Sequence, residues 1–171
     1  MFKGIIIFIL TVFCVSNVYA STVYDYPASA DSVAKNLPEL NSTSCKFSQE
    51  KSFKNTTLKS GGNFQFIKDK GVIFETLYPV KSTTSYTSSQ NKQINAIVTG
   101  IANKDYSFIN KNFKMYYIKN GEIWTVALRP KENTPASKQL KDIVIHGKTN
   151  INQININTLN GTNTAIQFFC N

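Results

Sequence analysis

The chain has 171 residues, of which 19 are lysine or arginine and 10 are aspartate or glutamate, giving a formal net charge of +9 at pH 7. Arg129 is the only arginine, and the lysines are spread along the chain. Nucleic-acid-binding domains cluster their basic residues and use arginine for phosphate and base contacts, so this composition does not favour a nucleic-acid partner. Two interpretations of the charge stay open: a solvated basic surface, or attraction to anionic membrane headgroups or an acidic partner.

Residues 1–20 have the pattern of a secretory signal peptide. Lys3 provides a positive charge, residues 5–15 are apolar, and the segment ends in a small residue, Ala20, at a cleavage position. The apolar run is too short to cross a bilayer comfortably. We therefore expect cleavage after Ala20, export as a soluble protein, and one domain over residues 21–171.

Two cysteines remain after this cleavage, Cys45 near the start of the mature chain and Cys170 near its end. In an oxidising compartment a lone pair of cysteines is most simply a disulfide. The bond would close a loop of about 125 residues, which on the disputed chain-entropy model stabilises the fold by about 4 kcal/mol. Two thiols and His146 are too few ligands for a metal site, so we expect no metal and no cofactor.

Helical periodicity occurs in two segments. Residues 29–40 carry apolar side chains at i, i+4 and i+7, which predicts a short amphipathic helix whose last turn is limited by Pro38. Residues 91–104 carry a second apolar stripe, and a further helical turn is predicted over residues 105–110. The apolar positions are Val33, Leu37 and Leu40 in the first segment and Ile94, Ile97, Val98 and Ile101 in the second.

The rest of the chain has the alternating pattern of β-strands. Turn signals at Asn120-Gly121 and Asn160-Gly161 separate several of them. The predicted strands cover residues 44–54, 57–68, 71–78, 81–87, 113–119, 122–129, 140–146, 150–157 and 163–169. An antiparallel sheet of this size curls or closes, so the sequence predicts an α+β fold with a large curved sheet and one helical insertion.

The segment over residues 60–79 is the most informative part of the chain. It predicts two strands joined at Asp69-Lys70-Gly71, where glycine supplies a positive φ. Side chains alternate between the two faces of a strand, so the aromatic residues of this hairpin share a face with one basic residue. The residues on that face are Phe64, Phe66, Lys68, Val72, Phe74 and Thr76. This pattern fits the wall of a hydrophobic cup, and it equally fits an ordinary sheet core.

Several short motifs follow one another along the chain in a characteristic order. They are Phe47-Ser-Gln49, Gly62-x-Phe64-x-Phe66, Val72-x-Phe74 before Pro79, the helical insertion, Leu128-Arg-Pro130-Lys131, Ile143-x-Ile145, Ile154-x-Ile156, Gly161 and Thr164-x-Ile166-x-Phe168. In this order, over most of the mature chain, they resemble the periplasmic carriers of outer-membrane lipoproteins, the LolA-like superfamily. The resemblance implies an unclosed β-barrel, a curved antiparallel sheet of about nine to eleven strands, with a few helices covering a hydrophobic cavity.

The resemblance also implies roles for particular residues. Phe64, Phe66, Val72 and Phe74 would line the cavity. Ile94, Ile97, Ile101 and Lys68 would contact the helical lid. Lys68 stands where the carriers have an arginine that ties the sheet to the lid, and lysine offers a point charge in place of a planar fork of donors.

The function implied is that of a periplasmic carrier, which holds the acyl chains of a lipid or lipoprotein and passes them towards the outer membrane. Its expected partners are membrane-bound donor and acceptor proteins, and it is expected to be a monomer. The alternative is an exported, β-rich adhesive or structural interaction protein without a lipid cargo. We expect no enzyme, because the sequence lacks a nucleophile–base set, paired carboxylates and a glycine-rich phosphate loop.

Three further residues are assigned structural roles from their sequence context. We expect Trp124 to be a packing anchor and Arg129 to be a surface or ion-pair residue. His146 precedes Gly147 at a strand end, which predicts an exposed turn residue.

Overall fold

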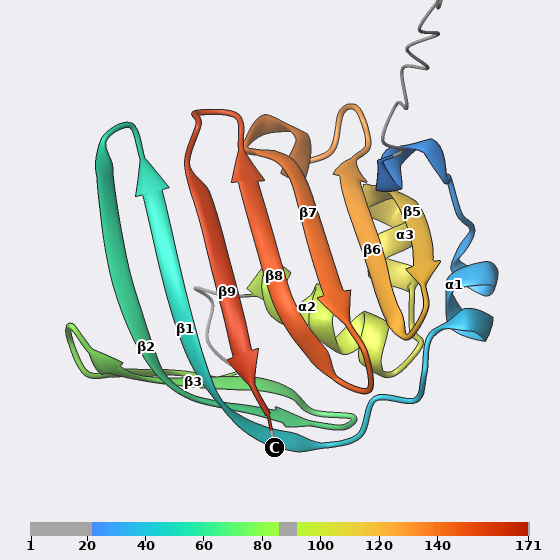
Figure 1. Cartoon of the computed structure of the whole chain (residues 1–171). Coiled ribbons are helices and arrows are strands. Elements are labelled where there is room, and N and C mark those ends of the chain that lie inside the picture. Colours follow the sequence, from blue (N-terminus) through green and yellow to red (C-terminus); the bar gives the residue numbers. More distant parts are fainter. Residues whose placement is uncertain (1–21, 86–91, 171) are drawn as a thin grey trace, which may run out of the picture.

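A computed structural model describes residues 22–85 and 92–170 of the chain. Its largest element is one antiparallel sheet of nine strands (Figure 1). The strands are β1 (Thr43–Phe53), β2 (Thr56–Ile67), β3 (Gly71–Tyr78), β4 (Ser82–Thr84), β5 (Phe113–Asn120), β6 (Ile123–Pro130), β7 (Leu140–Gly147), β8 (Ile151–Thr158) and β9 (Asn163–Phe169).

The sheet is curved, as its size predicts, and unclosed, as the resemblance implies. The strand order is β4-β3-β2-β1-β9-β8-β7-β6-β5, so the first long strand lies beside the last. The outer strands β4 and β5 do not pair with each other. Figure 1 shows β3 passing beneath the ends of the more upright strands, which turns this side of the sheet into a bend.

The first helix, α1 (Ala30–Asn36), is shorter than the predicted helix over residues 29–40. The hydroxyl oxygen of Ser29 caps its start by accepting a hydrogen bond from the amide of Ser32 at 3.2 Å. Leu37 leaves the helix with ψ of 139°. Pro38 explains this early end, because a residue that precedes proline avoids the helical region.

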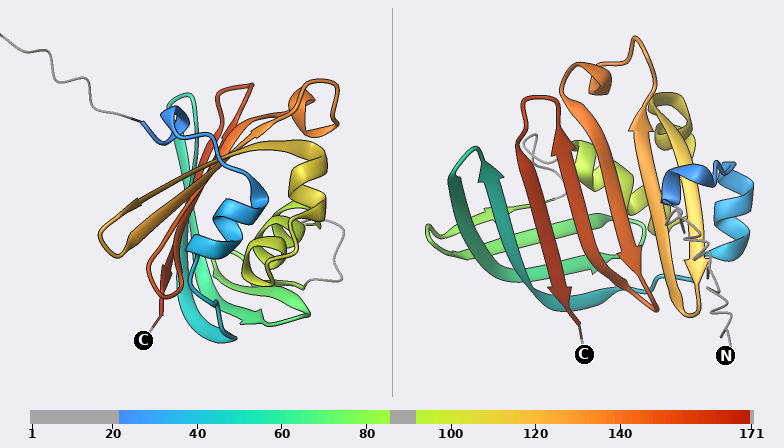
Figure 2. Two further views of the ribbon diagram at one scale, coloured as in Figure 1. Left: turned by 90° about the vertical axis from the view of Figure 1, so that its right-hand side faces the viewer. Right: turned by 45° about the horizontal axis from the view of Figure 1, so that its top comes forward.

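The helical insertion between β4 and β5 contains α2 (Lys92–Ala102) and α3 (Ser107–Asn112). The first of these helices contacts β3 and the second contacts β5. Figure 2 shows α1, α2 and α3 on the same side of the sheet, with α2 lying within the bend. The helices therefore cover the concave face, as expected of a lid.

The segment before α1 wraps around the β5 edge of the sheet. A short helix, η1 (Val23–Asp25), contacts β5 and β6. The chain then pairs with β5 through an antiparallel bridge between Pro27 and Tyr116 and a hydrogen bond from the Tyr117 amide to the Tyr26 carbonyl at 3.0 Å. This segment occupies part of an edge that would otherwise offer unpaired backbone groups.

Trp124 anchors the packing at one end of the sheet, as predicted. It is fully buried, and its indole nitrogen donates to the carbonyl of Lys148 at 2.8 Å. Gly147 pairs with it across the strands, and a Cβ there would lie 2.1 Å from the indole ring. Only a glycine fits beneath this ring.

The structure corrects the prediction for His146 and refines the one for Arg129. His146 is half-buried within β7 and shares a hydrogen bond with the Thr125 hydroxyl at 2.9 Å, because the strand continues to Gly147. Arg129 is exposed and lies 3.6 Å from the ring centroid of Tyr24, so it holds η1 by a cation–π contact.

Element boundaries otherwise agree with the predicted ones to within a few residues. The strand expected over 81–87 is observed as β4, and residues 86 and 87 lie outside the described residues. The predicted signal peptide over 1–20 also lies outside them and stays a prediction. The structure adds two short helices that the sequence patterns do not predict, η1 and η3 (Ala136–Lys138).

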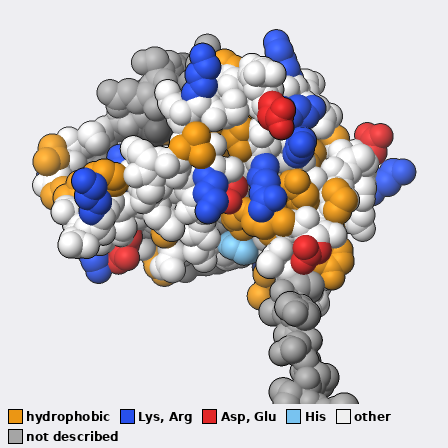
Figure 3. Space-filling view, turned by 90° about the horizontal axis from the view of Figure 1, so that it is seen from above, with side chains coloured by type: hydrophobic (Ala, Val, Ile, Leu, Met, Phe, Trp, Pro, Cys, Tyr) orange, Lys and Arg blue, Asp and Glu red, His pale blue; other side chains and the backbone are white. Residues whose placement is uncertain are grey.

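The Cys45–Cys170 disulfide is present, with sulfurs 1.99 Å apart. The basic side chains visible in Figure 3 are interspersed with uncharged and acidic ones. Within residues 22–85 and 92–170, no helix is both long enough and apolar enough to cross a membrane.

Candidate functional site

A pocket of about 320 Å³ lies between the concave face of the sheet and α2. Strands from both halves of the sheet contribute to it, because β1 and β9 are neighbours. Its lining residues are Phe47, Gln49 and Lys51 on β1, Ser60 on β2, Phe74 and Thr76 on β3, Thr84 on β4, Ile156 on β8, Thr164 and Ile166 on β9, and Ile94 on α2.

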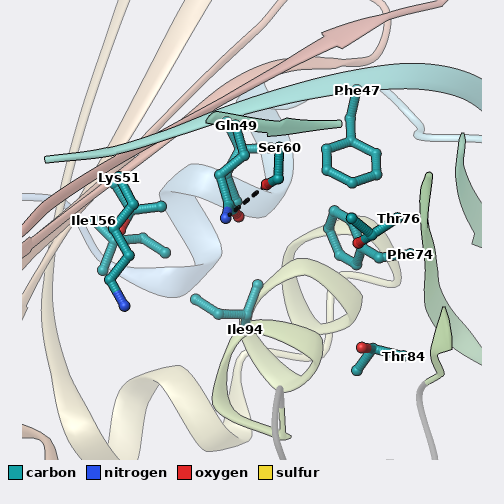
Figure 4. Close-up of a pocket in the computed structure, with 11 residues that line it drawn as sticks. Phe47, Gln49, Lys51, Ser60, Phe74, Thr76, Thr84, Ile94 and Ile156 are labelled. Atoms are coloured by element: carbon teal, nitrogen blue, oxygen red, sulfur yellow. Dashed lines mark hydrogen bonds between the residues drawn. The ribbon is translucent and has the colours of Figure 1, made fainter. Parts of the chain in front are cut away.

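Aromatic rings form one wall of this pocket (Figure 4). Phe47 and Phe74 meet edge to face with ring centroids 5.2 Å apart. Phe74 also packs on Phe64 at 5.0 Å, and Phe64 packs on Phe168 at 4.4 Å. The rings therefore belong to one cluster that continues from the pocket into the buried core.

Uncharged polar side chains lie in the middle of the pocket. Gln49 and Ser60 are cross-strand partners, and the Gln49 amide donates to the Ser60 hydroxyl at 3.3 Å. Figure 4 shows this pair between the Phe47 and Phe74 rings on one side and Lys51 on the other. A ligand in the pocket would meet both apolar walls and hydrogen-bonding groups.

Lys51 is the one charged residue among those that line the pocket. Its cross-strand neighbours are Leu58 on β2 and Thr164 on β9. Because side chains alternate along a strand, Phe47, Gln49 and Lys51 face the same side of the sheet. The order along β1 is thus aromatic, uncharged polar, cationic.

The four residues predicted to line the cavity occupy different environments. Phe74 lines the pocket just described. Phe64 and Phe66 border a much smaller void of about 20 Å³ beneath Val98 and Ala102 of α2. Val72 is 2% exposed and packs in the core. The hairpin is therefore part cup and part ordinary core.

The predicted lid residues on α2 also divide between pocket and core. Ile94 lines the pocket, whereas Ile97 and Ile101 are each 1% exposed within the hydrophobic core. Two asparagines join this helix to the β2–β3 hairpin. The side-chain oxygen of Asn95 accepts from the Val72 amide at 3.0 Å, and that of Asn103 accepts from the Asp69 amide at 3.4 Å.

In the described part of the chain, Lys68 finds its partner outside the 91–110 lid segment, which differs from the prediction. Its ammonium group pairs with the carboxylate of Glu39, in the connection between α1 and β1, at 2.5 Å. The physical reason is that a carboxylate attracts an ammonium group more strongly than a neutral carbonyl does. Their hydrogen bond raises the pKa of Lys68 and lowers that of Glu39.

Most of the polar part of the pocket is absent from the sequence-based site. Thr76 was placed on the pocket face of the hairpin by its alternation with Phe74. The other polar lining residues were not predicted, and they are Gln49, Lys51, Ser60, Thr84 and Thr164. A usable signal was present for β1, since the alternation from Phe47 places Gln49 and Lys51 on the same face as that ring. The other positions depend on strand order, which local patterns do not reveal.

The described part of the chain contains no obvious metal-binding site. No group of three or more histidine, cysteine, aspartate or glutamate side chains there is arranged to hold an ion. The half-buried His146 has Thr125 as its hydrogen-bond partner, and burial lowers the pKa of its imidazole.

Comparison with known proteins gives a likeness in structure and none in sequence. No family model matches the chain, and no curated protein matches it. Among solved structures, a LolA superfamily protein from Nitrosomonas europaea matches over 82% of this chain and 91% of that chain, with 6% identity and a TM-score of 0.37. At this TM-score the likeness carries no conclusion about activity.

Proposed function

We propose that this protein is a periplasmic carrier that holds lipid acyl chains in the pocket beneath α2. The observation that carries the proposal is the half-open space of about 320 Å³ between a concave sheet and a helix. Its apolar walls are supplied by Phe47, Phe74, Ile94, Ile156 and Ile166.

The physical chemistry of such a pocket suits an acyl chain. Its volume falls in the range of about 300–1,000 Å³ typical of small-molecule sites. Burying a methylene group contributes about 0.8 kcal/mol, so a short stretch of chain binds without covalent chemistry. Lipid then leaves when a membrane or an acceptor protein binds it more tightly, and membrane-bound donor and acceptor proteins are the partners we propose.

The proposed compartment rests on the disulfide and on the predicted signal peptide. A disulfide between Cys45 and Cys170 persists in an oxidising compartment such as the periplasm. The sequence of residues 1–20 supplies the export signal that this location needs.

Lipid extraction tests the proposal directly. The mature protein, purified without detergent, is extracted with organic solvent, and the extract is analysed by mass spectrometry. A delipidated sample is then titrated with an apolar fluorophore, followed by competition with a twelve-carbon fatty acid. We expect co-purified lipid, a rise in fluorescence, and its reversal by the competitor.

A matched pair of variants locates the binding. Thr76 lines the pocket, whereas Leu77, the next residue of β3, is exposed and does not line it. Thr76→Phe fills the pocket and should weaken fluorophore binding at least about tenfold, whereas Leu77→Phe should leave it unchanged. Equal effects of the two would show that binding occurs elsewhere.

The absence of both lipid and fluorophore binding would overturn the carrier proposal. The runner-up function, an exported adhesive or structural interaction protein, would then take its place.

A further inference from the structure

We propose that the lipid held in this pocket has an anionic head, a carboxylate or a phosphate, which pairs with Lys51. The inference rests on the proposed carrier function and names the class of its cargo. The ligand would lie along β1, with its apolar tail against Phe47 and Phe74 and its head at Lys51.

The first observation is the charge of the pocket. The lining residues include one cation, Lys51, and no acid. Among the described residues, Lys51 makes no ion pair, whereas Lys59, Lys68 and Lys148 each pair with a glutamate. A cation without a counter-ion at the wall of a half-enclosed pocket attracts anions and repels other cations.

The second observation is the order of chemical groups along β1. Phe47, Gln49 and Lys51 follow one another on one face, so about 13 Å of strand separates the first position from the last. The Gln49–Ser60 hydrogen bond provides an uncharged polar group between these ends. A single-chain amphiphile has the same order of parts: an apolar tail, a polar linkage and a charged head.

The surroundings of Lys51 strengthen this arrangement. Its cross-strand partner on β9 is Thr164, which also lines the pocket. The hydroxyl group of Thr164 can donate a hydrogen bond to an anionic oxygen. Ile156 on β8 pairs with the same Thr164, and Lys51 and Ile156 both line the pocket (Figure 4). The aliphatic stem of Lys51 therefore adds to the apolar wall while its ammonium group can meet a head group.

The size of the space limits the ligand to one chain. A volume of about 320 Å³ lies at the lower end of small-molecule sites. A fatty acid and a single-chain phospholipid both satisfy the inference, since each joins one chain to an anionic head. The two sources are separated by comparing their heads on the same chain.

The experiment measures competition by four probes of equal chain length against a bound apolar fluorophore. The probes are dodecanoate, dodecyl phosphate, dodecanol and dodecyltrimethylammonium. At low salt we expect one or both of the anionic probes to bind about tenfold more tightly than dodecanol, and the cationic probe to bind more weakly. This preference should shrink as salt is added, because salt screens partly exposed charges.

Two variants with the same loss of charge test the assignment to Lys51. Lys51→Gln should abolish the preference, so that the anionic probes and dodecanol bind this variant with the same affinity. The control is Lys46→Gln, because Lys46 is exposed on the opposite face of the same strand. That variant should keep the full preference.

The outcomes separate this inference from the function on which it rests. Binding of no probe at all would overturn the carrier function. Equal binding of anionic and neutral probes, or a preference that survives in Lys51→Gln, would overturn the anionic cargo and leave the carrier standing. Displacement of the fluorophore by inorganic phosphate alone would identify a free-anion site and would also overturn the lipid-head assignment.

Discussion

Phe47 and Phe74 touch edge to face, although the strand β2 lies between the two strands that carry them. The residue of β2 opposite Phe47 is Gly62, which is also where the pairing of β2 with β3 shifts register at a bulge. A Cβ at Gly62 would collide with the backbone of Glu75 and Leu77 on β3. The close pairing of β2 with β3, which brings the strands of the two rings together, therefore depends on a glycine.

Gly62→Ala should lower the free energy of unfolding by about 2 kcal/mol or more. A Cβ at this position would lie 1.9 Å from the backbone oxygen of Glu75, and a backbone atom within a sheet cannot move aside cheaply. Chemical denaturation of the purified variant measures the loss. Gly161→Ala is the control: the glycine has φ of +84° and open space around it, so only about 1 kcal/mol of backbone strain is expected. Equal costs would contradict the steric explanation.

Asn95 is expected to hold α2 on the sheet more firmly than Lys68 does. The side-chain oxygen of Asn95 accepts a hydrogen bond from the backbone amide of Val72, a buried residue of β3. The short strand β4 ends before it could pair with Val72. Asn95→Ala leaves that donor without its partner and should cost about 1–3 kcal/mol, with faster amide exchange in α2.

Lys68→Met is the comparison for that variant. The ion pair of Lys68 with Glu39 is exposed, and exposed pairs contribute little to stability. Hydrogen exchange measured by mass spectrometry over residues 92–102 should therefore be nearly unchanged. Faster exchange in Lys68→Met than in Asn95→Ala would restore the lysine as the residue that latches the lid.

The Cys45–Cys170 disulfide should contribute about 2–5 kcal/mol to stability, since it links residues separated by 125 positions in the sequence. It continues the pairing of β1 with β9, whose nearest residue pair is Lys46 with Phe169. The double variant Cys45→Ser/Cys170→Ser and the reduced wild-type protein should lose similar amounts in urea unfolding. Two freely alkylated thiols in the exported, unreduced protein would show that the bond does not form.

His146 should make the protein less stable at mildly acidic pH. Burial lowers the pKa of its imidazole below the ordinary value of 6.5, so between the two values the unfolded state binds more protons. Its contribution is complete above pH 6.5 and is lost as the pH falls through that value towards the folded pKa.

The replacement His146→Gln tests this pH dependence. The difference in unfolding free energy between pH 7.5 and pH 5.5 should be smaller in the variant than in the wild-type protein. Carboxylates with lowered pKa values, Glu39, Asp105 and Glu122, lose their contributions at lower pH and do so in both proteins. An identical pH dependence in the two proteins would show that folding does not shift the pKa of His146.

The sequence by itself determined the local elements and the class of fold. Alternation and turn residues predicted β3 and β9 with their observed bounds, and Asn120-Gly121 located the β5–β6 turn, where Gly121 has φ of 61°. These features depend on neighbours along the chain, whose spacing is visible in the sequence. The lone cysteine pair predicted the disulfide because no other partner remained.

Only the tertiary structure decided which side chains share the pocket. Lys51 and Thr164 face each other because β1 and β9 are neighbours, a pairing between opposite ends of the chain that local patterns do not encode. The same holds for Lys68, whose partner Glu39 precedes β1 in the sequence and reaches it only through the fold. Side chains far apart in sequence meet where the backbone pairing and the curvature of the sheet bring them, so the full lining of the pocket became visible only in three dimensions.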